Sequence, residues 1–199
     1  TSNLFNDWGI QKNSTTLGES YGQGGAVTGK SFTDNYYNAF GTMTDQVAHG
    51  YSQNNINGTW TVTSIWDTTA VDIDAYGTIT SSEVTSFSGK GYTGNEALYN
   101  TASWTPVGTD FTTLTGRSIT GNLFNDWGIQ KNSTTLGESY GQGIAVTGKS
   151  FTDNYYNAFG TMTDQVAHGY SQNNINGTWT VTSIWDTTAV DIDAYGTIT

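Results

Sequence analysis

The stretch "NGTWTVTSIW", residues 57–66, indicates how this chain folds. Its Asn-Gly pair is a hairpin signal, because both central residues of a type I′ turn need a positive φ. After the pair, Trp60 and Val62 alternate with threonines, so apolar and hydroxyl side chains fall on opposite faces of an extended chain. The stretch therefore predicts an antiparallel β-strand that starts at a tight turn.

The residues around this stretch continue the pattern. In "AVDIDAYGTIT", residues 70–80, apolar residues alternate with acidic ones, and "WDTT", residues 66–69, is expected to connect two strands. Further strands are expected at 26–32, 39–44, 83–88 and 110–120, and short helical turns at 34–40 and 95–100. Helix signals are otherwise weak, because β-branched and aromatic residues dominate. The sequence predicts an all-β fold.

Most of the sequence occurs twice in the chain. Residues 1–80 reappear as residues 120–199, with differences only at Ser2 against Gly121 and Gly25 against Ile144, whereas residues 81–119 occur once. We take 119 residues as the period, because a 39-residue module seldom sustains a core alone without disulfides or metal. Residues 1–119 are then a first full period, and residues 120–199 are a partial second one. Each period is expected to form an antiparallel β-sandwich or barrel-like unit.

A β-solenoid is the alternative architecture. Gly-Thr-x-Thr occurs at Gly41, Gly58 and Gly77, at spacings of 17 and 19 residues that suit one solenoid coil. The joint between the copies, residues 116–122, reads as strand and not as a flexible linker, so consecutive periods are expected to be coupled stiffly.

Composition excludes several classes of partner. The chain has no Cys, 17 acidic residues against 6 basic ones, and a net charge of -11. Such a chain lacks the cationic footprint that nucleic acids or anionic membranes require. No apolar stretch approaches the roughly 18 residues of a membrane-spanning helix, so no membrane insertion is expected in this segment.

Catalytic signals are missing, and an enzyme is not expected. His49 and its copy His168 are the only histidines, and neither lies near a nucleophile signature. Asp67, Asp72 and Asp74 are candidate Ca²⁺ ligands, because carboxylates two residues apart share a strand face. Their copies are Asp186, Asp191 and Asp193. The alternative is a solvated acidic face that discourages edge pairing, in which case no cofactor is present.

Aromatic residues stand beside Asn and Asp in several turn-like segments. A ring that stacks on the C–H face of a sugar, next to amides that bind its hydroxyls, makes a carbohydrate site. The candidate residues for such a site are Trp8, Asp34, Asn35, Tyr36, Tyr37 and Asn38. The alternative is that the aromatics, Trp60 among them, form the core of a chain with few aliphatic residues.

Repetition itself indicates the class of function. An enzyme needs one good site, whereas a protein that works through length, valency or self-association gains from each copy. We therefore expect a segment of an extracellular or cell-surface structural or adhesive protein that self-associates into a stalk or filament, with copies of itself as partners. A multivalent lectin that binds glycans is the alternative. An ice-binding repeat, which needs a flat threonine face, is a further one.

Overall fold

The computed structural model describes residues 1–187, 190, 192 and 193. Its strands are β1 (Ser2–Phe5), β2 (Gln11–Tyr21), β3 (Val27–Tyr37), β4 (Met43–Ile56), β5 (Thr59–Ile73), β6 (Ile79–Tyr92), β7 (Phe111–Phe124), β8 (Gln130–Tyr140), β9 (Val146–Tyr156), β10 (Met162–Ile175) and β11 (Thr178–Asp186). The described helices are three-residue 3₁₀ turns, and none of them is long and apolar enough to cross a membrane.

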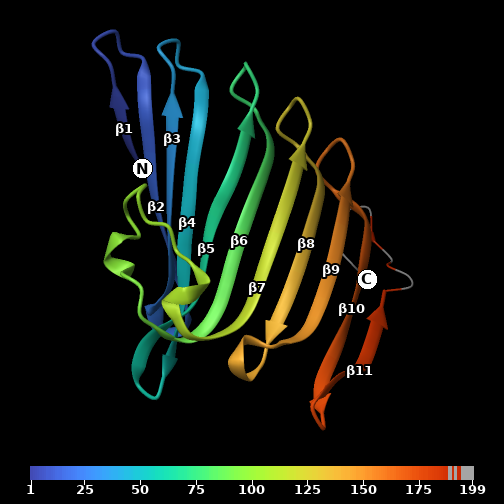
Figure 1. Ribbon diagram of the computed structural model, residues 1–199. Coiled ribbons are helices and arrows are strands. Elements are labelled where there is room, and N and C mark those ends of the chain that lie inside the picture. Colours follow the sequence, from blue (N-terminus) through green and yellow to red (C-terminus); the bar gives the residue numbers. More distant parts are fainter. Residues whose placement is uncertain (188–189, 191, 194–199) are drawn as a thin grey trace.

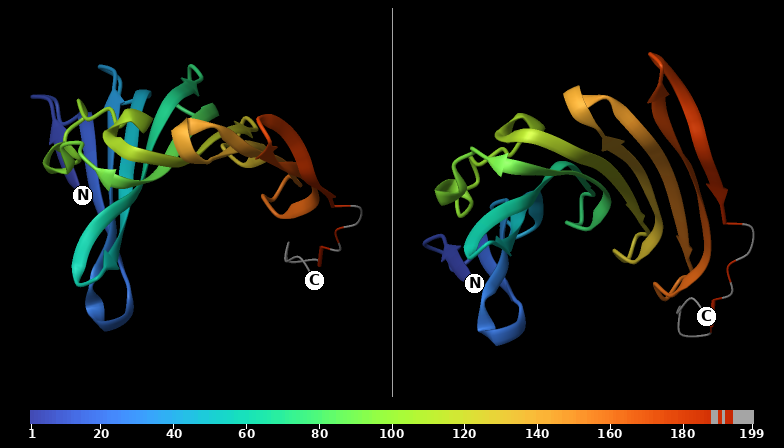
Figure 2. Two further views of the ribbon diagram at one scale, coloured as in Figure 1. Left: turned by 60° about the horizontal axis from the view of Figure 1, so that its bottom comes forward. Right: turned by 90° about the horizontal axis from the view of Figure 1, so that it is seen from below.

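The described strands form one antiparallel sheet in which each strand pairs with the next along the chain. The sheet is strongly twisted and does not close on itself (Figures 1 and 2). The predicted all-β, antiparallel class is confirmed. The sandwich or barrel-like unit is not what forms, because there is no second sheet in the described residues and no closure. A solenoid is excluded for these residues, because its coils pair in parallel.

Turn chemistry sets the strand lengths. The predicted Asn57-Gly58 hairpin is confirmed, with φ of 53° and 87° at the two residues. The prediction of a connection at residues 66–69 is wrong, because β5 runs through it without interruption. The Gly-Thr-x-Thr spacing therefore measures the length of a strand plus its turn, and successive Gly-Thr pairs lie at opposite ends of the sheet (Figure 1).

The second sequence copy continues the same sheet. Strands β2, β3 and β4 recur as β8, β9 and β10 with bounds shifted by 119 residues, and the copy of β1 lies within β7. Six strands, β1 to β6, thus precede the start of the second copy. Because antiparallel strands alternate in direction, an even number returns the chain to its starting direction, and matching turns of the two copies reach the same end of the sheet.

Residues 93–110, which we call the cover segment, cross one face of the sheet in the first copy (Figure 1). The predicted helical turn is present at Glu96–Leu98, and the Asn95 side chain accepts a hydrogen bond of 3.2 Å from the Ala97 N–H. Trp104 is buried and belongs to the core cluster, together with Tyr51, Val62, Ile65 and Phe111. The cover segment therefore completes the first copy's core.

The face under the cover segment carries apolar side chains on several strands, together with a few ionisable ones. Directly paired residues share a face, which places Phe32, His49 and Asp67 in one row and Lys30, Tyr51 and Ile65 in the next. A bulge between Ser52 and Gln53 in the pairing of β4 with β5 lets Val62 face the same side as Ile65.

The second copy has the same rows without such a cover. Ile65 is fully buried, whereas its copy Ile184 is 79% exposed. Val62 is 3% exposed, and its copy Val181 is 48% exposed. Two differences explain why identical residues differ in burial. Within the described residues, only the first copy is followed by a segment that folds back over it, and β11 is an edge strand, whereas β5 is flanked by β6.

This pair of isoleucines gives a matched stability test. Ile65→Ala is expected to lower the free energy of unfolding by about 2–5 kcal/mol, because it opens a cavity in a closed core. Ile184→Ala removes the same atoms from an exposed site and is expected to change it by less than about 0.5 kcal/mol. Urea titration followed by tryptophan fluorescence measures both values. Equal losses for the two variants would contradict the assigned burial.

Candidate functional site

Five loops of the described chain have one geometry and lie at one end of the sheet (Figure 1). They connect β1 to β2, β3 to β4, β5 to β6, β7 to β8, and β9 to β10. Each follows the pattern Asn or Asp, any residue, aromatic, Gly, any residue. The loops are 6–10, 38–42, 74–78, 125–129 and 157–161.

The loop at 38–42 shows how the pattern produces the turn. Asn38 Oδ1 accepts hydrogen bonds from the N–H groups of Phe40, at 2.9 Å, and Thr42, at 3.0 Å. The backbone adds Asn38 N–H to Thr42 O, at 2.9 Å, and Gly41 N–H to Asn38 O, at 3.0 Å. Gly41 has φ of +81°, which glycine adopts without strain. The other four loops repeat these four bonds.

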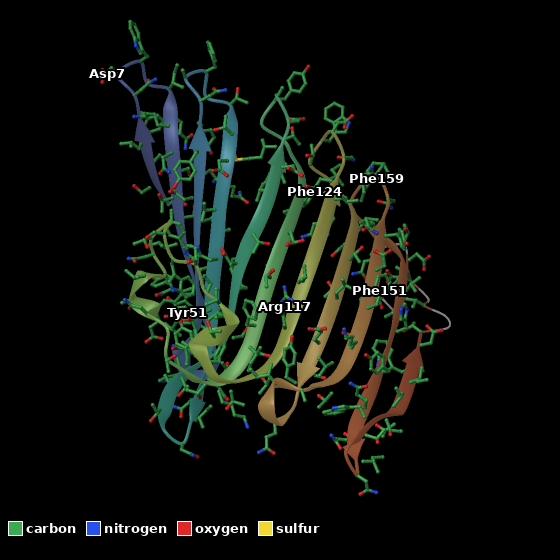
Figure 3. The ribbon with its side chains drawn as sticks, viewed as in Figure 1. Asp7, Tyr51, Arg117, Phe124, Phe151 and Phe159 are labelled. Carbon is green, nitrogen blue, oxygen red and sulfur yellow. The ribbon has the colours of Figure 1, made fainter. Side chains whose placement is uncertain are left out.

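The third residue of each loop projects an aromatic ring into solvent. These five rings, which we call the aromatic rim, are between 86% and 90% exposed. Figure 3 labels Asp7, in the first loop, and Phe159, in the last, at the two ends of this row. Neighbouring hairpins are two strands apart, so successive tips are spaced by about 9.5 Å along the sheet. The rim comprises Trp8, Phe40, Tyr76, Trp127 and Phe159.

The hydrogen bonds of the turn do not explain why a large ring at its tip is exposed to solvent. The turn is closed by the Asx side chain, the backbone and the glycine, and the ring takes part in none of these bonds. Single exposed aromatic residues are common on protein surfaces. A row of five at equivalent positions is instead a shared feature of one end of the sheet. The rim is therefore the candidate functional site.

The sequence-predicted carbohydrate residues reach the rim only in part. Trp8 lies in it, and Asn38 holds one of its turns. Asp34 is 7% exposed, and its carboxylate accepts hydrogen bonds of 2.7 Å from Asn13 and Thr15. A hydrogen bond to Asp34 raises the pKa of Tyr36 to about 12.

The other two candidates lie on the opposite face of the same strand. Asn35 and Tyr37 alternate with Asp34 and Tyr36 along β3, and the Asn35 side chain accepts a hydrogen bond of 2.7 Å from Gln46. The six residues therefore do not line one common pocket.

Sequence reasoning misses most of the rim. It predicts a strand at residues 39–44 and a helical turn at 34–40, and both predictions are wrong, because β3 ends at Tyr37 and β4 begins at Met43. A signal is present in the sequence, because an Asn or Asp three residues before a Gly recurs at equal positions in every loop. The intervening aromatic hides it, since an aromatic residue favours a strand by propensity.

The predicted calcium ligands have separate partners. Asp72 accepts a hydrogen bond from the Ser81 hydroxyl, and Asp74 Oδ1 closes its loop through the N–H groups of Tyr76 and Thr78. Asp67 lies elsewhere, opposite His49. Among the copies, Asp186 pairs with His168, Asp193 is described, and Asp191 lies outside the described residues. Within the described part, no three acidic or histidine side chains gather as a metal site.

Asp67 lies instead beside His49, and His49 contacts the cover segment. His49 Nε2–H donates to the Tyr99 carbonyl at 2.7 Å, and its Nδ1 is 4.0 Å from Asp67 Oδ1. Burial lowers the pKa of His49, opposed by that hydrogen bond, and burial raises the pKa of Asp67 to about 6, opposed by the Thr68 backbone N–H. At neutral pH the site thus holds a neutral imidazole and a poorly solvated carboxylate.

The raised pKa of Asp67 gives a pH-dependent test. The folded chain binds the Asp67 proton more tightly than the unfolded chain does, because the pKa is about 6 in the folded state and 3.8 ordinarily. Ionisation of Asp67 therefore destabilises the fold fully above about pH 6. The destabilisation is absent below pH 3.8, where the carboxyl is protonated in both states. Asp67→Asn is expected to stabilise the chain by about 1–3 kcal/mol at pH 7.5 and by close to zero at about pH 4. Urea titrations at the two pH values measure this difference. Asp186→Asn, at the exposed copy, is the control and is expected to stay within about 0.5 kcal/mol; a gain equal at both pH values for Asp67→Asn would refute this cause.

Comparison with known proteins assigns no family to the chain. No protein-family model matches it, and no curated protein matches it. A crystal structure of a protein of unknown function from Bacteroides fragilis aligns with 88% of this chain and 94% of its own, at 8% identity and a TM-score of 0.26. Similarity at that level carries no argument about fold or function.

Proposed function

We propose that this chain is a segment of a repetitive structural and adhesive protein whose adhesive surface is the aromatic rim. The sheet serves as the scaffold, and the rim attaches it to an extended carbohydrate polymer. We place the protein outside the cell or on its surface, where such polymers are found. The row of five exposed rings in loops of one geometry is the observation that carries this proposal.

The chemical identity of the rim residues supports binding through the ring itself. The same loop position holds Trp, Phe and Tyr in different hairpins, while the Asx and Gly positions keep their turn chemistry. What the five positions share is an exposed aromatic face, not a particular polar group. A flat π face packs against the C–H groups of a sugar ring, and this contact does not require a hydroxyl or an indole N–H.

The linear arrangement favours a long ligand over a small one. The Asx oxygen beside each ring is already bonded to the turn, so it is not available to a sugar hydroxyl. A single ring is thus a weak site. Several rings spaced by about 9.5 Å engage one polymer together, and the second and later contacts are intramolecular, which raises the overall affinity by a factor of about 10²–10⁴.

Charge disfavours an anionic surface as the ligand. The chain carries a net charge of -11, and Asp7 and Asp126 stand directly beside the two tryptophans of the rim. An anionic lipid or polyanion would be repelled from the aromatic rim. Neutral polysaccharide meets no such barrier.

A continuous sheet also suits a stalk or filament made of further copies. The joint between the copies is the uninterrupted strand β7, so no flexible linker separates them. The ice-binding alternative has no comparable support, because it needs a flat threonine face and the sheet is strongly twisted (Figure 2).

Replacing rim rings tests the adhesive function. Trp8→Ala, Phe40→Ala and Trp127→Ala, combined, are expected to weaken binding to insoluble cellulose or chitin by at least about 30-fold, because avidity falls with each ring removed. Each single variant is expected to lose a few-fold. Pull-down isotherms measure these losses, and unfolding curves check that the fold is unchanged.

Leucine substitutions distinguish ring stacking from simple hydrophobic contact. The triple leucine variant keeps apolar tips without π faces and is expected to bind as poorly as the alanine variant, whereas Phe40→Tyr is expected to bind like the parent. Retained binding by the leucine variant, or transfer of the binding to neutral phosphatidylcholine vesicles, would point to a lipid surface and refute the carbohydrate assignment. Polysaccharide binding that is unaffected by the triple alanine variant would refute the role of the rim.

Chain length tests the structural part of the proposal. If further copies extend the same sheet, each added period of 119 residues contributes six strands and about 29 Å of sheet width. Small-angle X-ray scattering on chains with one, two and three added periods measures this increment. Separate compact units joined as beads would give a different and linker-dependent increment.

A further inference from the structure

The same five side chains are buried in the first sequence copy and accessible in the second. Phe32, His49, Tyr51, Val62 and Ile65 are each less than 9% exposed. All five of their copies are half-buried or exposed, and we call the set the open face. The open face consists of Phe151, His168, Tyr170, Val181 and Ile184.

The first copy shows what covers such a face. The Trp104 ring lies edge-on to His49 at 5.0 Å and to Tyr51 at 6.5 Å between ring centroids. The Tyr99 ring lies edge-on to Tyr51 at 5.6 Å, and Lys30 Nζ is 5.3 Å from the centre of the Tyr99 ring. With the His49 bond to the Tyr99 carbonyl, these contacts define how the cover segment docks.

The open face has the geometry of the covered face of the first copy, and no described segment lies over it. Phe151 stacks on His168 with ring centroids 4.9 Å apart, the same separation as between Phe32 and His49. Lys149, Tyr170 and Ile184 are paired across β9, β10 and β11 in the register of their first-copy counterparts. A hollow of about 430 Å³ is lined by Phe151, His168 and Tyr170 of this face. The strand register and the Phe–His stack of this face therefore form without a cover segment.

Charge complementarity supports the same occupant. The cover segment contains Glu96 and Asp110 and no Lys or Arg. Arg117, Lys149 and Glu138 line the hollow beside the open face, and Lys149 Nζ is 2.9 Å from Glu138 Oε1. Two cations stand against one carboxylate in this lining, so a segment of net negative charge meets one excess positive charge, although the chain as a whole is strongly acidic.

We propose that the open face is a docking site for a cover segment, that is, for a chain segment with the sequence of residues 93–110, supplied by a further period. Its tryptophan would occupy the hollow beside His168 and Tyr170, and its tyrosine carbonyl would accept the imidazole N–H. Each period then closes its core with the residues that follow its strands. The proposal deepens the proposed assembly of periods but is independent of carbohydrate binding by the rim.

Binding of the cover segment in trans tests this site. A fluorescein-labelled peptide of residues 93–110 is titrated with the full chain, and fluorescence anisotropy is recorded. We expect saturable binding with a dissociation constant below about 1 mM. The Trp104→Ala peptide and the chain variant Ile184→Asp are each expected to weaken binding by at least about tenfold. The first loses the aromatic ring that packs into the site, and the second replaces an apolar side chain of the open face with a charged one. Trp127→Ala, in the rim, is the matched control and is expected to bind the peptide like the parent.

A lengthened chain that carries a second cover segment avoids the loss of affinity of a separate peptide. Residues 81–119 are appended after Thr199, so that the segment reaches the open face within one chain. We expect slower hydrogen exchange in β10 and β11, reversed when the appended tryptophan is replaced by alanine. No peptide binding together with unchanged exchange in the extended chain would overturn the proposal. Dimerisation of the parent chain that Ile184→Asp abolishes and the peptide does not compete would overturn it too, by showing that a second copy occupies the face.

The two proposals fail separately. Loss of cellulose or chitin binding in the rim variants is independent of peptide docking, because the rim and the open face share no residue. An intact peptide site in a chain that binds no polysaccharide would leave the docking inference standing and remove the adhesive one.

Discussion

Packing of Trp104 and Tyr99 onto His49 and Tyr51 is the contact on which the core of the first copy depends. A single sheet cannot bury its own face, and its strands contribute apolar surface that is useful only when another layer lies over it. In this chain the second layer is one irregular segment between β6 and β7. It contributes few residues, but two of them are large aromatics, and they exclude water from an imidazole, a tyrosine and two aliphatic side chains.

The two copies act as an internal control for that contact. The strands, turns, registers and the Phe–His stack form in both copies, so the hydrogen-bonded sheet and its turn chemistry do not need the cover segment. Burial of the apolar face does need it. Local sequence therefore specifies the sheet, and a segment distant along the chain specifies the core.

This division explains what can be predicted from the sequence. Asn57-Gly58 and the cap at Asn95 carry their information locally, and both predictions are confirmed. Trp60 is expected in the core because it is large and alternates with threonines, yet it is 41% exposed, because alternation shows which residues share a face and not which face is covered. Asp67 indicates a turn by its residue type, whereas the pairing with His49 keeps it inside a continuous strand. The rim escapes prediction because its turn signal surrounds an aromatic residue.

The even number of strands between equivalent points of the two copies bears on how such a protein evolves. A duplication that adds six strands leaves every existing turn on its own side of the sheet, so copy number can rise or fall by recombination between near-identical repeats without any new folding problem. An insertion of five or seven strands would place the aromatic loops that follow it at the opposite end of the sheet. Copy number can thereby change while the aromatic loops of each copy stay at the same end of the sheet.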